Sequence, residues 1–331
     1  MINKRTVLVL GAGASVPFKF PSGLQLLDTI CNTLSSKTSL EFKLISECTP
    51  EIRDILRFRD ALSRSGQPSV DAFLEHRTEF IDIGKTAIAA VLLPYERTAA
   101  LFEAKREQNC YHYLLSLLST PFADLNKNRL SIITFNYDRS FEQYLFTSLK
   151  NTYHITDQEC VEKLASIPII HVHGKLGSLP WEENVRKETA GSSNPPKKSV
   201  PFDSFHNPDL TSHEDYEWYR KIWIKLARDN IKIIHESSDE GTEFDQARQL
   251  LAGAERIYFL GFGYHETNLR RLRINDLCNP DDPIREICGT VYGLSHQKRE
   301  MLKKYKQTPN KLIDLIDAKV YDLLYNHAFL D

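Results

Sequence analysis

The sequence has no CxxC pair, no long apolar run and no excess of either charge. Its six cysteines are scattered over 331 residues. In a chain of this length, that spacing argues against a zinc ribbon and against a disulfide framework. We therefore expect reduced thiols, a cytoplasmic location and no bound metal.

Charge and hydropathy exclude further classes of protein. Lys and Arg total 42 against 44 Asp and Glu, a net charge of −2, so no global basic field would recruit nucleic acid or an anionic membrane. Because no run of about 18 apolar residues is present, no membrane helix is expected. The apolar run 7–10 is shorter than the about 7 residues that a signal peptide needs, and we interpret it as a buried strand.

The chain opens with the apolar run TVLVL at 6–10, which leads directly into GAGAS at 11–15. This order predicts a strand, a glycine turn and a helix. Small residues let a backbone approach a pyrophosphate, and free N–H groups of such a turn favour its charge. Candidate dinucleotide-binding residues are Gly11, Ala12, Gly13 and Ser15; a structural turn after a buried strand is the alternative.

Further short apolar runs predict strands at 130–135, 168–172, 231–234, 257–262 and 290–294. They lack polar alternation and are separated by helical patterns, which is typical of a parallel sheet covered on both faces. The expected fold is a Rossmann-like, doubly wound α/β sheet in a single domain, 1–331. The spacing of Leu24, Leu27, Cys31 and Leu34 predicts a helix lying on that sheet.

Three regions stand apart from the sheet pattern. Residues 40–125 are mostly helical and predict a cap or insertion. Residues 180–230 contain a Pro-, Gly- and Lys-rich loop at 188–201, followed by an aromatic helix. The tail at 300–331 carries an apolar stripe. The helical region and the tail are candidate interfaces, and ordinary core packing is the alternative for both.

The second polar cluster follows the expected strand 130–135, in the sequence Thr134-Phe-Asn136-Tyr-Asp138. In parallel sheets, ligands bind outside the carboxyl ends of the strands, so these side chains are expected to face a cleft. Asn136 can orient water or a sugar hydroxyl, and Asp138 can accept a hydrogen bond from an amide. Capping of the next helix is the alternative for both.

The third cluster, His171-Val-His173-Gly174, ends the strand 168–172. A histidine can act as a general base, and Gly174 would leave space for a ligand. Two structural histidines, or a metal pair, are the alternatives. A fourth run, 257–268, ends in a glycine turn in which Gly261 and Gly263 could admit phosphate or ribose.

Taken together and in this order, these motifs resemble the sirtuin family. GAGAS is similar to its phosphate loop, residues 135–138 to its Gln-Asn-Ile-Asp segment, and His173-Gly174 to its catalytic His-Gly. Ile234-His-Glu stands where sirtuins have Phe-Gly-Glu, and 261–263 where they have Gly-Thr-Ser. The matches are patchy and span about residues 5 to 295.

The departures favour one branch of that family. The four-cysteine zinc module of protein-deacylating sirtuins is missing, and the loop after Ser15 lacks Ile-Pro-Asp-Phe-Arg. The pattern is closer to bacterial sirtuin-like effectors, a resemblance that implies hydrolysis of NAD, often in antiphage defence. It also implies NAD as substrate, activation by self-assembly or a partner such as an ATPase, and an oligomer.

By that resemblance Asp138 would hold the carboxamide and Asn136 the water or ribose. His173 would act as the base, with His171 as second choice. The alternatives are a deacylase or ADP-ribosyl transferase on the same scaffold, and a module that senses NAD or ADP-ribose without turnover. A dehydrogenase is the least favoured, because Asp28, near the distance for a ribose-binding acid, lies in a helical pattern.

Overall fold

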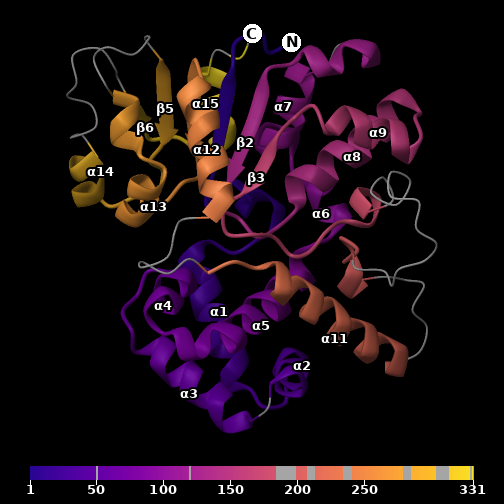
Figure 1. Ribbon diagram of the computed structural model, residues 1–331, viewed down its shortest axis with the longest axis vertical. Coiled ribbons are helices and arrows are strands. Elements are labelled where there is room, and N and C mark those ends of the chain that lie inside the picture. The colour runs from indigo at the N-terminus through magenta and orange to yellow at the C-terminus, as the bar shows by residue number, and fades with distance from the viewer. Residues whose placement is uncertain are drawn as a thin grey trace.

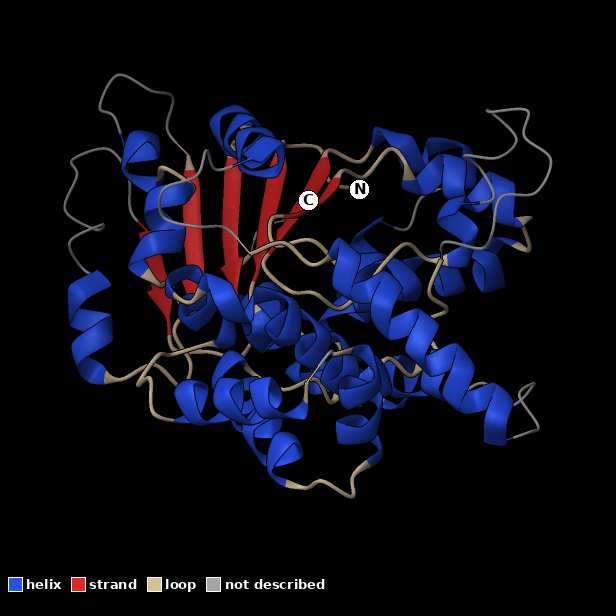
Figure 2. Cartoon of the chain, turned by 60° about the horizontal axis from the view of Figure 1, so that its bottom comes forward, coloured by secondary structure: helices blue, strands red, loops and turns tan. Residues whose placement is uncertain are grey.

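The computed structural model describes residues 1–49, 51–118, 121–183, 199–206, 213–233, 241–278, 285–302, 313–328 and 330. A six-stranded parallel sheet has the order β3-β2-β1-β4-β5-β6. Figure 2 shows the strands side by side in this sheet. Its strands are β1 (Thr6–Leu10), β2 (Leu130–Thr134), β3 (Ile169–His171), β4 (Arg256–Leu260), β5 (Glu286–Thr290) and β6 (Ile313–Ile316). This is the order of the doubly wound dinucleotide-binding fold. The predicted fold class is confirmed.

Helices precede, connect and cover these strands. Those that the structure describes are α1 (Gly23–Ser35), α2 (Leu40–Cys48), α3 (Ile52–Ser63), α4 (Val70–His76), α5 (Ile81–Leu92), α6 (Thr98–Glu103), α7 (Cys110–Leu118), α8 (Ser140–Tyr153), α9 (Asp157–Leu164), α11 (His213–Asn230), α12 (Gly241–Gly253), α13 (Glu266–Arg271), α14 (His296–Leu302) and α15 (Val320–Asn326). Within the described ranges, no helix is long and apolar enough to cross a membrane.

The sheet is buried on both faces. Successive residues of a strand point to opposite faces, so Leu8 and Tyr258 belong to one apolar cluster, whereas their neighbours Val9 and Phe259 belong to another. The parallel register sets Val9 opposite Phe259. This double burial is why the strands read as continuous apolar runs without polar alternation.

A group of helices, α1 to α5 together with α11, lies beyond the carboxyl ends of the strands and forms the cap (Figure 1). Helix α11 packs against α5 and α2, although about 120 residues of chain separate it from α5 and about 165 from α2. A buried ion pair joins the segment that follows α5 to the sheet layer: Arg139, at the start of α8, donates from Nε to Glu96 Oε1 at 3.0 Å. The cap is therefore assembled from two separate parts of the chain.

The cap differs from the helical region predicted at 40–125. Helix α1 was expected to lie on the sheet, but it packs against α3 and α5. Leu27 and Leu34 of the expected stripe are buried, but Leu24 is 58% exposed. Leu26 and Ile30, which lie outside that stripe, are buried as well. Helix α7, predicted in the cap region, packs instead against α8 and α15 beside the sheet.

Other segment predictions have mixed outcomes. The strand expected at 290–294 is wrong, because β5 occupies Glu286–Thr290 and ends where that segment begins. Of the strand expected at 231–234, Ile231 forms only an isolated bridge with Gly174, residues 232–233 are not in a strand, and residue 234 lies outside the described residues. Residues 184–198, most of the expected Lys-rich loop, also lie outside them. In the tail, Leu315 and Ile316 belong to β6, and Leu312 is not described.

Candidate functional site

The candidate site is a cavity of about 440 Å³ between the cap and the carboxyl ends of the strands. Its sheet side is formed by the turns after β1 and β4, with Asn136 and His173 beside them. Strands β1 and β4 are neighbours at the switch point of the sheet, where chain order reverses and ligands bind in this fold. Helix α4 of the cap forms the opposite side.

The glycines of the two turns pack directly against each other. A Cβ on Gly11 would lie 2.5 Å from the carbonyl oxygen of Gly261, and one on Gly13 would lie 2.8 Å from the Gly261 Cα. Gly261 itself has φ +58°, the left-handed region that favours glycine. These three glycines are thus needed for contact between the turns. All three also line the cavity, as do Ala12 and Gly263.

The sequence predicts free backbone amides in the turn after β1, but the structure shows most of these amides engaged in hydrogen bonds. Gly11 donates its N–H to the Leu260 carbonyl at 3.0 Å, and Gly13 donates to Gly261 at 3.0 Å. The N–H groups of Ala14 and Ser15 donate back to carbonyls within the turn itself. Amides that were expected to be free for a pyrophosphate are therefore engaged, and the Ala12 amide is the one that is not among these donors.

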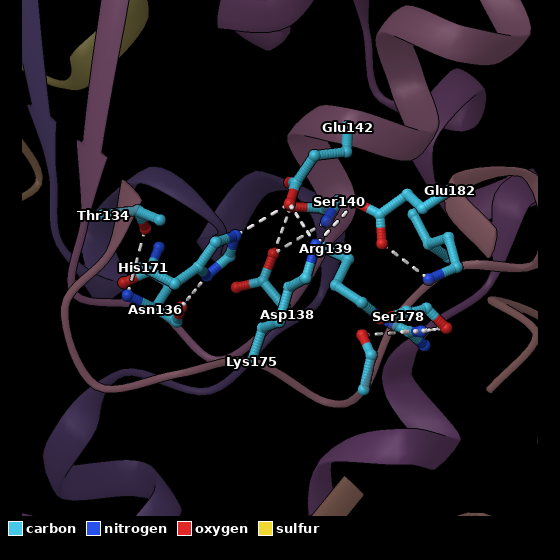
Figure 3. A network of polar contacts seen from close by, with 12 residues as sticks. Thr134, Asn136, Asp138, Arg139, Ser140, Glu142, His171, Lys175, Ser178 and Glu182 are labelled. Carbon is cyan, nitrogen blue, oxygen red and sulfur yellow. Dashed lines mark hydrogen bonds and ion pairs between the residues drawn. The ribbon is translucent and has the colours of Figure 1, made fainter. Parts of the chain in front are cut away.

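Asn136 is held in a fixed orientation at the cavity wall. Its backbone N–H donates to Thr134 Oγ1 at 3.0 Å (Figure 3). Its side-chain nitrogen donates to the Gly11 carbonyl and to Ser15 Oγ, both at 3.0 Å. Because both amide hydrogens are used in this way, the side-chain carbonyl oxygen is the atom left for a ligand. Thr134, predicted to bind the ligand directly, positions Asn136 and is not among the lining residues.

Asp138 and Ser15 lie behind the cavity wall. Ser15 Oγ donates to Asp138 Oδ2 at 2.8 Å, and the Ser140 N–H donates to Asp138 Oδ1 at 3.1 Å. Burial raises the Asp138 pKa, and the bonds from the two serines partly oppose that shift. Neither Asp138 nor Ser15 lines the cavity, so both predicted ligand contacts are absent from this geometry. The two residues instead tie the first turn to the start of α8.

His171 is a positioning residue. Its Nδ1 lies 2.9 Å from the Asn136 backbone carbonyl, and its Nε2 lies 2.7 Å from Glu142 Oε1 (Figure 3). Burial would raise the pKa of Glu142, but the nearby His171 and Lys175 outweigh it and hold that pKa at about 2. Both ring nitrogens of His171 are therefore engaged with protein groups, and His171 is not among the residues that line the cavity.

His173 has different surroundings. It lines the cavity, is 5% exposed, and its Nδ1 has no hydrogen-bond partner among the described residues. Burial lowers its pKa to about 4, and the charge of Arg271 adds to that shift. The rings of Phe135 and Phe244 meet it edge-on, with centroids at 5.6 and 6.2 Å. The imidazole is therefore neutral at pH 7, and its unpartnered Nδ1 is buried.

Gly174 serves packing rather than ligand access. It has φ +71°, and a Cβ there would lie 2.0 Å from the carbonyl oxygen of Asn230. The Lys232 N–H also donates to the His173 carbonyl at 2.8 Å. The end of α11 thus crosses close to this strand end and needs a glycine there. Gly174 does not line the cavity, contrary to the expectation of space for a ligand.

Sequence reasoning missed the cap side of the cavity. Asp71 and Glu75, on α4, line it, and Tyr137 donates a hydrogen bond from its phenol to Asp71 Oδ1. Arg271 Nη1 lies 2.8 Å from Glu75 Oε1 and bridges α13 to the cap. In the sequence, α4 lies within the helical region predicted at 40–125, whose acidic residues were not singled out. Only the fold brings α4 over the strand ends.

Comparison with known proteins adds no relative. No model of a known protein family matches the chain, and no curated protein matches its sequence. Among the described residues, no group of three or more His, Cys, Asp or Glu side chains is arranged to hold a metal ion. The resemblance to sirtuins therefore stays a prediction from the motifs.

Proposed function

We propose that this protein is an NAD glycohydrolase, which cuts NAD into nicotinamide and ADP-ribose. The observation that carries the proposal is that Asn136 and His173 line one cavity at the switch point of a Rossmann-like sheet. Asn136 lies beside the glycine turns, and Nδ1 of His173 has no hydrogen-bond partner among the described residues. Sites at this position in doubly wound sheets bind dinucleotides.

Cleavage of NAD does not require the protein to assist the leaving group. Nicotinamide in NAD is cationic, so its departure gives a neutral base and needs no general acid. The site must instead stabilise an oxocarbenium-like ribose and place a water against C1′. The fixed carbonyl oxygen of Asn136 can hold a ribose hydroxyl or that water. The neutral imidazole of His173 can accept a hydrogen bond from either.

The location of Asp138 bears on the alternative activities of this scaffold, such as deacylation. In the sequence interpretation this carboxylate holds the carboxamide, a contact that a deacylase on the same scaffold would share. Since Asp138 is bound by Ser15 and Ser140 behind the wall, the proposal does not depend on it. We keep the wider proposal of an NAD-depleting effector of bacterial defence, activated by self-assembly or a partner, as an extension from the resemblance.

The test is nicotinamide release from NAD by the purified chain, followed by chromatography over a range of protein concentrations. We expect release by the wild type, and its loss in Asn136→Ala and His173→Ala with both variants folded. The matched control is His296→Ala, whose imidazole is 89% exposed and is not among the residues that line the cavity. Wild-type protein that releases no nicotinamide at any concentration, or variants with full activity, would contradict the proposal.

A further inference from the structure

Asp71 faces Asn136 and His173 from the opposite side of the cavity. It lies in the first turn of α4 and is half-buried. Its Oδ1 accepts the hydrogen bond from the Tyr137 phenol, and Tyr137 follows Asn136 directly in the chain. The segment that presents Asn136 therefore also fixes the Asp71 carboxyl group. A ligand in the cavity would lie between α4 and the strand ends, in reach of both sides.

Among the residues that the structure describes, no direct ion pair neutralises the charge of Asp71. Its partner Tyr137 is a neutral phenol, whereas the neighbouring Glu75 is paired with Arg271 at 2.8 Å. Asp138 lies outside the lining. Asp71 is thus a carboxylate that faces the cavity with its charge and with lone pairs available to accept a proton. A developing ribose cation in the same cavity would be stabilised by it.

The two candidate bases differ in basicity. Burial, assisted by Glu75, raises the pKa of Asp71 to about 6, whereas burial and the charge of Arg271 lower that of His173 to about 4. The titratable and charged groups around Asp71 are Glu75 and His76 on α4, Arg271 on α13, and Tyr137 and His173 from the strand ends. A base is most effective when its pKa lies near the working pH.

We propose that Asp71 is the general base of the hydrolysis, a role that rests on the NAD glycohydrolase function proposed above. The water oxygen forms a bond to C1′ of the nicotinamide ribose while the N-glycosidic bond breaks. That bond's electron pair leaves with nicotinamide and neutralises its ring. The water proton passes to the Asp71 carboxylate and then to solvent, so the products are ADP-ribose, nicotinamide and one proton. His173 and Asn136 orient the ribose and the water.

The first arm of the test compares two isosteric substitutions in the cap. Asp71→Asn keeps the shape but cannot take the proton, and we expect kcat for nicotinamide release to fall by about 10² to 10⁴ fold with KM for NAD little changed. Asp82→Asn, on the exposed face of α5, is the matched control and should keep wild-type activity. Melting temperatures establish that each variant is folded.

The second arm separates proton transfer from positioning. Azide is an anionic nucleophile with no proton to lose, so added sodium azide should restore nicotinamide release in Asp71→Ala and yield ADP-ribosyl azide. It should not restore His173→Ala. In Tyr137→Phe, loss of a hydrogen bond that favours the charged carboxylate should move the acidic limb of the kcat profile to higher pH.

The outcomes distinguish this inference from the function on which it rests. Wild-type activity that survives in Asp71→Asn would overturn the role of Asp71 and leave the hydrolase intact. An inactive Asp71→Asn, together with Asp71→Ala that azide does not restore, would make Asp71 a positioning residue and also overturn its role as base. A wild-type chain without nicotinamide release would overturn both proposals.

Discussion

The imidazole of His171 binds the backbone carbonyl of Asn136, with 2.9 Å between Nδ1 and the oxygen. The opposite ring nitrogen binds Glu142, so one buried ring connects α8 to the cavity wall. Two histidines that are separated by one residue therefore have distinct tasks. His171 holds the wall in place, and His173 lines the cavity.

His171→Ala should destabilise the protein strongly. The substitution leaves the ionised Glu142 buried without its closest partner, and breaking a buried pair in this way costs about 3–5 kcal/mol. We expect a loss of that size in the free energy of unfolding, measured by urea denaturation at pH 7. The exposed substitution His296→Ala is the control. A loss below about 1 kcal/mol, the range of exposed pairs, would show that the pair does not hold the wall.

The neutral state of His173 should make stability depend on pH. The pKa is about 4 in the folded chain against an ordinary 6.5, so the unfolded state gains its proton first as the pH falls. This contribution to stability is complete above pH 6.5 and is lost between pH 6.5 and 4, by about 3 kcal/mol. The check is urea denaturation at pH values from 7 to 4.

His173→Phe removes that titration while it keeps an aromatic ring among Phe135 and Phe244. All other groups titrate equally in both proteins, so the difference between their stability curves isolates His173. The wild type should lose more stability than the variant across this window. Parallel curves for the two proteins would refute the low pKa.

Gly13→Ala should disrupt the contact between the two glycine turns. Its Cβ would lie 2.8 Å from the Gly261 Cα, a backbone atom that cannot move aside cheaply. We expect a loss of about 1–3 kcal/mol in stability and weaker NAD binding, measured by denaturation and calorimetry. In Gly253→Ala, where a Cβ meets nothing within 4 Å, stability should be unchanged or slightly higher. Equal behaviour of the two variants would argue against close packing of the turns.

The sheet could be predicted from sequence because its determinants are local. Buried parallel strands are short apolar runs, and the small residues that the turn after β1 needs can be recognised in the sequence. Where the helices pack could not be predicted in the same way. Both α1 and α7 are amphipathic, and periodicity does not say which surface an apolar face covers.

The candidate site could be predicted only in part, because some of its contacts join residues that are far apart in the chain. Asn136 and His173 follow β2 and β3, which are neighbours in the sheet. The topology alone therefore brings them together at the carboxyl ends of the strands. Asp138 and Ser15 also follow strands, yet they bind each other across 123 residues and turn away from the cavity. Asp71 comes from the cap and reaches the cavity only through the tertiary fold. Side-chain partners far apart in the chain leave no periodic signal in a single sequence.

The central claim is that this cavity cuts NAD with water. Its most direct test is the product balance of the purified wild-type chain incubated with NAD, with nicotinamide and ADP-ribose quantified together by chromatography. We expect the two products in equal amounts, and neither in Asn136→Ala or His173→Ala. Nicotinamide without free ADP-ribose would indicate transfer to another acceptor, and the absence of both products would leave the cavity without the proposed activity; either result would contradict the claim.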